Sequence, residues 1–299
     1  MVILKPLTGD IIVSSVVLNG VTFEAKSGDQ LEDVSMGLVS PQMVAICSSD
    51  DGPAAAIDQL LLSQGNIIDG SVEINGQDIA NFRRHPERVM AFFENVQLKG
   101  KTVEKVLHRA LRHVSGALDV EHTLQMLLPL GIKYNIKTAI LSAVQQQELK
   151  IIILLALRRP VVVLGDALDG LTEKSRLIIG NLIKDYTRKT DSLVIFTSDN
   201  VSTMMRFANT IYYFNSNRLT SARDLTMNDG VDCTVTVTGT GFPVEMAVKL
   251  GAHMLEEAEN EVRFLFTGNI QALLPLLEQS TITDVRIEDS TVEDELMAY

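Results

Sequence analysis

The chain has 299 residues, 46% of them hydrophobic, and a formal net charge of −12. This length can hold one large domain and a smaller one, and the hydrophobic fraction is ordinary for a globular protein. The negative charge argues against a nucleic-acid partner, which needs clustered Lys and Arg. The two cysteines, Cys47 and Cys233, form neither a metal-binding spacing nor a disulfide framework.

The chain opens without the basic start and long apolar run of a secretory signal, so we expect none. Its most apolar tract, residues 149–165, is interrupted by Arg158, Arg159 and Pro160. An uninterrupted apolar stretch of about 20 residues is needed to cross a bilayer. The tract therefore predicts a buried helix, a turn and a buried strand, with no direct membrane insertion.

The first part of the chain alternates apolar runs with helical patterns. Solid apolar runs at 88–93, 160–166 and 192–198 are typical of strands buried on both faces of a sheet. Helical patterns at 102–114 and 175–189 lie between them. This alternation predicts an α/β domain, which we assign to residues 1–222.

A polar segment containing Gly230, residues 223–232, predicts a linker. The segments after it read strand, helix, two strands around a turn at Glu259-Asn260, helix and strand. The order βαββαβ predicts a small α+β ferredoxin-like domain over residues 231–299.

Five short motifs then stand in a recognisable order, at residues 48–56 (SSDDGPAAA), 91–106, 141–148 (LSAVQQQE), 161–172 (VVVLGDALDGLT) and 194–214. Together they resemble the ATP-binding subunit of ATP-binding-cassette (ABC) transporters. The ending STVEDELMAY is similar to that of the small C-terminal domain in exporter ATPases. The resemblance covers roughly the whole chain. It implies a P-loop-NTPase-like ABC ATPase domain with a helical subdomain, followed by the small domain.

The phosphate loop of that family needs glycines, a lysine for the outer phosphates and a hydroxyl for Mg²⁺. In the alignment that the resemblance implies, the loop begins at Ser48. Asp51 and Pro53 replace glycines, and proline lacks an N–H donor. Ala54 stands at the lysine position and Ala55 at the metal-ligand position. The loop is therefore expected to be a degenerate nucleotide site.

The signature motif keeps Ser142 and Gln145, whereas Ala143 and Val144 replace its two glycines. The family presents this loop's backbone N–H groups to the γ-phosphate held by the opposite subunit. The β-branched side chain of Val144 is expected to obstruct that approach.

The acidic strand is also incomplete. Gly165 stands at the position of the Mg²⁺-binding aspartate, and Asp166 at that of the general-base glutamate. A slip of one residue would instead put Asp166 at the metal position and Ala167 at the base. Thr172 replaces the aspartate that couples the two sites of a dimer.

Three other family positions have changed as well. The metal-binding glutamine falls at Phe93 or, with a slip of one residue, at Glu94. The switch histidine is Asp199, whose carboxylate would repel a γ-phosphate. Ala25 stands at the adenine-stacking aromatic, and nearby Phe23 reads as a core strand residue.

The resemblance with these losses predicts a non-catalytic pseudo-ATPase subunit of an ABC-type membrane transporter, of exporter type. Its partners would be an active ABC ATPase subunit and a membrane permease, which would dock near residues 92–101. Phe92 and Phe93 could equally be core residues. We expect no cofactor or metal of its own, with ATP and Mg²⁺ bound only weakly or through the partner. The location would be cytoplasmic, peripheral on the inner face of the cell membrane.

Two other functions are compatible with the same residues. The chain could be a cytosolic interaction or regulatory protein that uses a degenerate ABC fold outside transport. It could also retain ATP binding or slow hydrolysis, for which Asp166 is the residue with a claim to chemistry. Membrane association separates the first from transport, and stabilisation by MgATP tests the second.

Overall fold

The computed structural model describes residues 14–48, 52–198, 200–225, 232–278 and 280–299. Its centre is a six-stranded sheet in the order β10-β9-β3-β8-β7-β6. The strands are β3 (Gln42–Ser48), β6 (Met90–Phe92), β7 (Val161–Gly165), β8 (Leu193–Thr197), β9 (Thr210–Asn215) and β10 (Arg218–Asp224). All pair in parallel except β10, which is antiparallel to β9. The predicted apolar runs are therefore strands of an α/β sheet.

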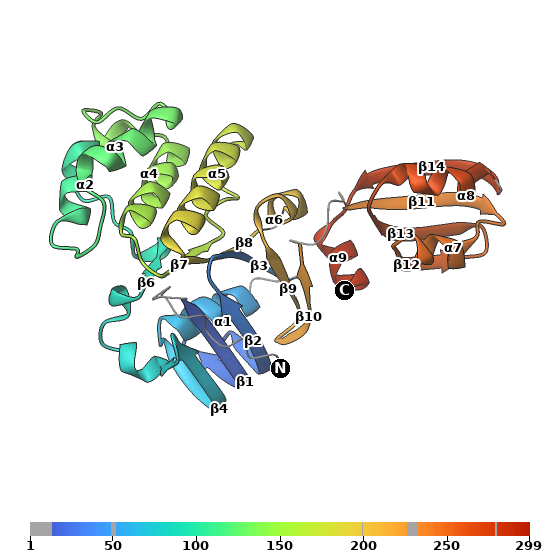
Figure 1. The fold of residues 1–299 in the computed structure, drawn as a ribbon, viewed down its shortest axis with the longest axis horizontal. Helices are drawn as coiled ribbons and strands as arrows, with labels where there is room; N and C mark the ends of the chain where they lie inside the picture. Colours follow the sequence, from blue (N-terminus) through green and yellow to red (C-terminus); the bar gives the residue numbers. More distant parts are fainter. Residues whose placement is uncertain (1–13, 49–51, 199, 226–231, 279) are drawn as a thin grey trace.

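A second, antiparallel sheet has the order β2-β1-β4-β5. Its strands are β1 (Ser15–Ala25), β2 (Gln30–Val39), β4 (Gly65–Ile74) and β5 (Gln77–Asp78). Helix α1 (Gly52–Leu61) lies between the two sheets (Figure 1) and shares one apolar core with both. Phe23 belongs to this core at 1% exposure, so the prediction of a core strand residue is confirmed.

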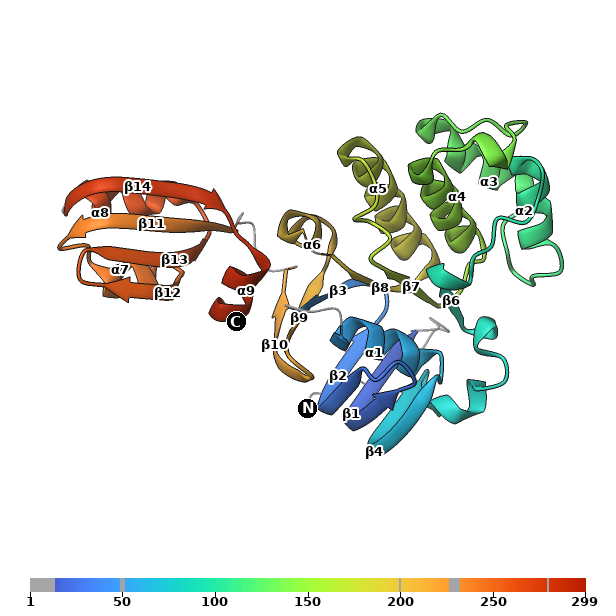
Figure 2. The same cartoon turned by 180° about the vertical axis from the view of Figure 1, so that it is seen from behind.

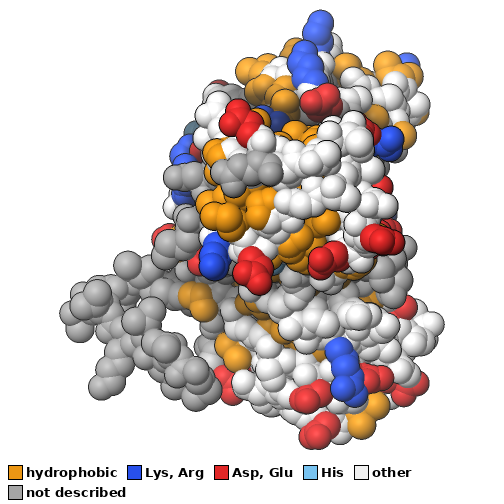
Figure 3. Space-filling model, turned by 90° about the vertical axis from the view of Figure 1, so that its right-hand side faces the viewer, with side chains coloured by type: hydrophobic (Ala, Val, Ile, Leu, Met, Phe, Trp, Pro, Cys, Tyr) orange, Lys and Arg blue, Asp and Glu red, His pale blue; other side chains and the backbone are white. Residues whose placement is uncertain are grey.

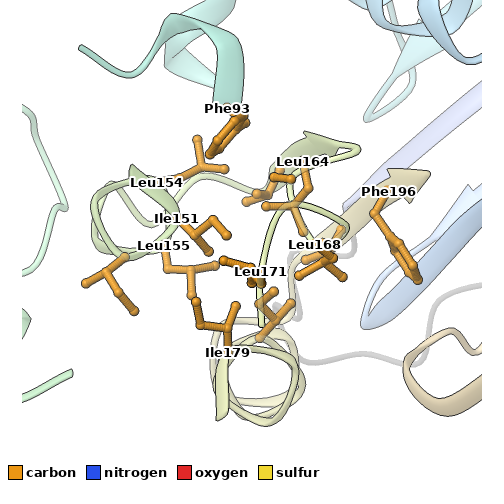
Figure 4. Close-up of a cluster of buried hydrophobic side chains, with 14 of the residues drawn as sticks. Phe93, Ile151, Leu154, Leu155, Leu164, Leu168, Leu171, Ile179 and Phe196 are labelled. Carbon is orange, nitrogen blue, oxygen red and sulfur yellow. The ribbon is translucent and has the colours of Figure 1, made fainter. Parts of the chain in front are cut away.

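The remaining helices of the first domain lie on the other side of the central sheet (Figure 1). They are α2 (Val103–Leu111), α3 (Val120–Leu127), α4 (Ala143–Ala156), α5 (Glu173–Thr190) and α6 (Val201–Phe207). In Figures 1 and 2, α2 and α3 stand away from the sheet beyond α4 and form a helical subdomain. Figure 4 shows the core where α4, α5, β7 and β8 meet, with Ile151, Leu164 and Ile179 pointing toward one another. Short 3-10 helices cover Ile79–Phe82, Pro86–Arg88, Phe93–Asn95, Leu128–Leu130, Thr138–Ile140 and Ile270–Leu273.

The C-terminal module is a four-stranded antiparallel sheet in the order β12-β13-β11-β14. Its elements are β11 (Asp232–Thr240), α7 (Val244–Lys249), β12 (Ala252–Ala258), β13 (Glu261–Thr267), α8 (Leu274–Glu278) and β14 (Thr281–Asp289). This βαββαβ order is the predicted ferredoxin-like arrangement. A last helix, α9 (Val292–Ala298), lies between the module and the central sheet (Figures 1 and 2).

The predicted linker is shorter than expected. Arg223 and Asp224 end β10, and Asp232 begins β11. The β-hairpin of β9 and β10 extends the first domain because its backbone groups pair along that whole length. The domain boundaries themselves stay a prediction, since residues 226–231 lie outside the described part of the chain.

The module is the most acidic part of the molecule. Residues 232–299 contain 13 Asp and Glu and 3 Lys and Arg, a formal charge of −10. Hydrophobic side chains lie among acidic ones on the end of the molecule that the module forms (Figure 3). Among the described residues of 232–299, the large apolar side chains that are exposed are Met246, Val248, Leu250, Leu274, Ile287 and Met297. In the described residues, no helix is long and apolar enough to cross a membrane.

Candidate functional site

The described residues of the predicted phosphate loop and acidic strand lie at one edge of the central sheet. Because β3, β7 and β8 are parallel neighbours, their carboxyl ends lie together, as in other open α/β sheets that bind ligands there. Ser48 ends β3, Gly165 ends β7, and α1 and α6 begin just beyond this edge. Asp51 and Asp199 lie outside the described residues, so their predicted roles stay predictions.

The first turn of α1 offers few groups to a phosphate. Pro53 is buried, and Ala54 and Ala55 are half-buried. A phosphate site at a helix start relies on free backbone N–H groups and, in P-loops, on a lysine. Proline has no N–H, and the two alanines end in methyl groups. At the start of the helix these three residues therefore supply no lysine ammonium, no hydroxyl and one backbone N–H fewer than a glycine at position 53 would.

The sequence reasoning missed Asp58, which faces this edge from the second turn of α1. A Cβ built on Gly165, a residue predicted to stand at the Mg²⁺-binding position, would lie 3.5 Å from Asp58 Oδ2. The carboxylate of Asp58 thus adjoins the space that a side chain at 165 would enter. The spacing could have revealed it, because Asp58 follows Ala54 by four residues and so lies above it on the same helix face.

Negative charge accumulates around Asp58. Burial, together with the nearby carboxylates of Glu94 and Asp166, raises the pKa of the Asp58 carboxyl to about 7. Asp166 is exposed just beyond β7, and Glu94 is exposed on the 3-10 helix after β6. In the described residues, no group of three Asp, Glu, His or Cys side chains is placed to hold a metal ion.

The described side chains at this edge lack the lysine and the hydroxyl with which a P-loop holds MgATP. They are alanine methyl groups and carboxylates, and a carboxylate repels phosphate. Gly165 has no side chain to coordinate a metal, and its φ of +56° is strained for other residues. We therefore derive no chemical step through a nucleotide or a magnesium ion.

The two candidates for the glutamine position lie in different environments. Phe93 is 8% exposed and joins the core against α4, with Lys150 Nζ 5.0 Å from its ring centre. Glu94 is exposed and close enough to Asp58 to perturb it. Glu94 is therefore the one of the two that faces the edge, and Phe93 is a core residue.

The two retained signature residues cap α4. Ser142 Oγ accepts a hydrogen bond from the Gln145 backbone N–H at 3.2 Å, and Gln145 Oε1 accepts one from the Ser142 N–H at 3.1 Å. This reciprocal pair is a capping box, which satisfies two otherwise unpaired helix donors. Ala143 is exposed, and Val144 is half-buried against the core. Ser142 and Gln145 thus have a structural role that needs no nucleotide.

The loop after β7 is fastened by three neighbouring elements. Gln147 Nε2 on α4 donates to the Ala167 carbonyl at 2.6 Å, and Ser198 Oγ after β8 donates to Asp169 Oδ1 at 2.5 Å. Arg176 on α5 donates to the carbonyls of Leu168, Asp169 and Leu171. A side chain at Gly170 would collide with Gln147, because a Cβ there would lie 2.3 Å from Oε1. The loop is held in place by the protein's own donors.

The adenine position is also unsuited to stacking. Ala25 is 5% exposed at the end of β1 and has no ring to place against a base. Phe23, two residues earlier, points into the core between the sheets. Neither residue presents an aromatic ring to this edge.

A groove lies between the central sheet and the helical subdomain, over the segment predicted to dock a permease. Its volume is about 310 Å³, and it is mostly apolar. Phe92, Val96 and Gln97 line it from the segment after β6, with Ala110 and Val114 from α2 and the turn that follows. Phe92 is 5% exposed, so it both belongs to the core and forms the groove floor.

Comparisons with known proteins agree with this fold. No protein-family model matches the chain. The ABC transporter ATP-binding protein YtrB of Bacillus subtilis (strain 168) is 21% identical over 203 residues, which are 68% of this chain and 70% of that protein.

Three solved structures show the same architecture. An ATP-binding subunit of an ABC transporter matches with a TM-score of 0.60 and 17% identity, over 70% of this chain and 90% of that one. An ATP-bound bacterial Atm1-family ABC exporter matches with a TM-score of 0.60 and 18% identity, over 71% and 39%. A dimeric bacterial ABC transporter cassette matches with a TM-score of 0.58 and 19% identity, over 70% and 98%. The chain therefore has the fold of an ABC ATPase cassette and resembles ABC transporter ATP-binding subunits.

Proposed function

We propose that this chain is a non-catalytic subunit of an ABC-type membrane transporter, of exporter type. The proposal rests on the set of side chains at the carboxyl edge of the central sheet. The described strands and α1 have the arrangement of an ABC cassette, Ala54, Ala55 and Gly165 stand where the resemblance puts functional residues, and Asp58 adds a carboxylate. A cassette that keeps its shape without its ligands is suited to pairing rather than to hydrolysis.

The partner in such a pair would be an intact ATPase subunit. ABC cassettes enclose nucleotide between the phosphate loop of one subunit and the signature of the other, and one of the solved structures resembling this chain is dimeric. With this chain, one composite site lacks a phosphate loop and the other faces a signature with Val144 in place of glycine. Hydrolysis would then be carried by the partner. A homodimer would contain two degenerate sites.

The groove over residues 92–97 is the proposed contact with the permease. It is mostly apolar, and its volume of about 310 Å³ suits the apolar anchor side chains of an amphipathic helix laid across it. The chain would then be peripheral on the cytoplasmic face of the membrane and need no spanning segment of its own.

The first test is a pull-down of the tagged chain from gently solubilised membranes of its own cells, read by mass spectrometry. Recovery of one ATPase with a lysine-containing phosphate loop and one membrane-spanning permease in fixed proportion supports the proposal. Gln97→Arg, which adds a charge at the groove, should release the permease. Gln125→Arg, at an exposed position of α3 outside the groove, should retain it. Recovery of soluble proteins alone would favour a regulator outside transport.

The second test concerns the nucleotide itself. A ligand that binds the folded state raises stability by RT ln(1 + [L]/Kd), which is about 2.7 kcal/mol at a hundredfold excess over Kd. We expect the melting temperature of the isolated chain to stay unchanged in millimolar MgATP. A saturable rise that needs Mg²⁺ would contradict a non-binding edge and support residual ATP binding.

A further inference from the structure

Helix α9 carries two adjacent buried carboxylates, and each of them pairs with a different domain. Asp294 is 2% exposed and Glu295 is 0% exposed. Burying a carboxylate costs free energy unless it is paired and hydrogen-bonded. The partners of these two residues therefore indicate what the helix is built to hold.

Asp294 is paired with the C-terminal module. Arg263 Nη2 on β13 donates to Asp294 Oδ1 at 2.7 Å, and Thr234 Oγ1 on β11 donates to Asp294 Oδ2 at 2.8 Å. Asp294 also closes a capping box with Thr291 at the start of the helix. One side of α9 is thus fastened to the two central strands of the module.

Glu295 is paired with the central sheet. Tyr213 Oη on β9 donates to Glu295 Oε2 at 2.8 Å, and Arg223 Nη1 on β10 lies 3.4 Å from the same oxygen. Tyr213 is 0% exposed, and burial and the Glu295 carboxylate raise the pKa of its hydroxyl. This ion pair is buried between the two domains, so the other side of α9 is fastened to the ATPase-like core.

Tyr299 repeats this two-sided contact just after the helix. Its ring stacks on that of Tyr213 with 5.3 Å between centres, and the Arg223 guanidinium carbon lies 4.7 Å from the ring centre. On the module side, the Tyr299 hydroxyl is 3.5 Å from His253 Nε2 and 3.4 Å from Thr267 Oγ1. Two successive turns of chain therefore bridge the domains by different interactions.

The start of α9 reaches the degenerate nucleotide edge. A polar pocket of about 460 Å³ is lined by Ser48 and residues 200–202 of the core and by residues 289–293 of the module. Helix α9 contacts β3 directly. Burial and the carboxylates of Glu295 and Glu293 raise the pKa of the Cys47 thiol on that strand to about 12. The helix thus lies beside the end of the strand from which the phosphate loop would emerge.

We propose that α9 is a strap that fixes the C-terminal module to the core and couples the position of the module to this edge. Asp294 anchors the strap in the module, and Glu295 anchors it in the core. Release of Glu295 frees the module from β9 and β10 and uncovers the end of β3 and the start of α6. The strap acts whether or not the chain has a partner ATPase.

The test uses the full chain and three changes, namely truncation after Ser290, Glu295→Ala and the milder Tyr213→Phe. Met297→Ala is the matched control, because Met297 is exposed on the same helix and does not line the pocket. Small-angle scattering measures the maximum dimension of each protein. Hydrogen exchange measures opening in residues 201–224, with far-UV circular dichroism as the check on folding.

We expect a larger maximum dimension and exchange about tenfold faster or more in residues 201–224 for the truncated chain and Glu295→Ala, as for loss of a charged hydrogen bond. Met297→Ala should match the unmodified chain. Unmodified dimensions and exchange in both altered chains would overturn the strap. If truncation or Glu295→Ala reduces the circular dichroism signal, Tyr213→Phe decides: faster exchange confined to residues 201–224 supports the strap, and unchanged exchange overturns it.

Discussion

The environment of Asp58 predicts how the free energy of unfolding changes with pH. Its carboxyl has a pKa of about 7 in the folded chain, against an ordinary value of 3.8, because burial and the carboxylates of Glu94 and Asp166 disfavour its charge. The folded state therefore binds the proton more tightly than the unfolded state. The stabilisation that the Asp58 carboxyl contributes is fully present below its unfolded pKa of 3.8, and it is lost as the pH rises through about 7.

The magnitude follows from the two pKa values. A tenfold difference in proton affinity between the folded and unfolded states corresponds to about 1.4 kcal/mol. Between pH values below 3.8 and above 7, the Asp58 carboxyl therefore lowers the free energy of unfolding by about 4 kcal/mol at most. Between about pH 5.5 and pH 8.5, a range that avoids the isoelectric point near 4.9, linkage gives a loss of about 2 kcal/mol. Asp58→Asn removes the titrating group and keeps the side-chain shape, so this loss should vanish.

The assay is urea unfolding of the unmodified chain and Asp58→Asn at several pH values across that window, compared as differences in unfolding free energy. Differences cancel the titration of other groups that both proteins share. Asp185→Asn is the control, because Asp185 is exposed on α5 and its pair with Lys189 is weak at 4.0 Å. Parallel pH profiles for all three proteins would refute the buried, charge-crowded environment of Asp58.

Three further changes test other parts of the structure. Ser142→Ala removes the capping box of α4 and should cost about 1 kcal/mol of unfolding free energy, whereas an equal midpoint in urea would contradict the role of Ser142 as a cap. Gly180→Ala should cost about 1–3 kcal/mol, because its Cβ would lie 2.2 Å from the Phe207 ring, and an unchanged melting temperature would show that α5 and α6 pack more loosely than described. Cys47, buried and with a raised thiol pKa, should resist alkylation in the folded chain while half-buried Cys233 reacts, and equal labelling of both by mass spectrometry would show that β3 is accessible.

The sequence was most informative where one physical signal dominated. The apolar runs around Val161 and Leu193 could become only inner strands, because no other element buries both faces of so short a segment. The turn at Glu259-Asn260 separates two apolar alternating segments, and β12 and β13 pair around it. Local pattern and tertiary position agree in these elements, so the fold class followed from them.

The burial of the acidic residues in α9 depends on distant partners, so the local sequence pattern could not predict it. The acidic run Glu293-Asp294-Glu295 reads as a solvated helix face, yet two of its members are buried. Their partners, Arg263 and Arg223, stand 31 and 72 residues away in the chain, and no local rule connects them. The predicted linker begins too early for the same reason, since Arg223 looks like a polar loop residue until Glu295 is seen beside it.

The degenerate edge is organised by the protein's own residues. In a working site, part of the loop geometry around the acidic strand can depend on the nucleotide that it contacts. In this chain Gln147, Arg176 and Ser198 supply the donors that hold residues 167–171, and Ser142 with Gln145 closes the start of α4. These hydrogen bonds fix the loop after β7 without any contribution from a nucleotide. Under the proposed pairing, an active ATPase would contact a face whose loop is held by the chain's own donors.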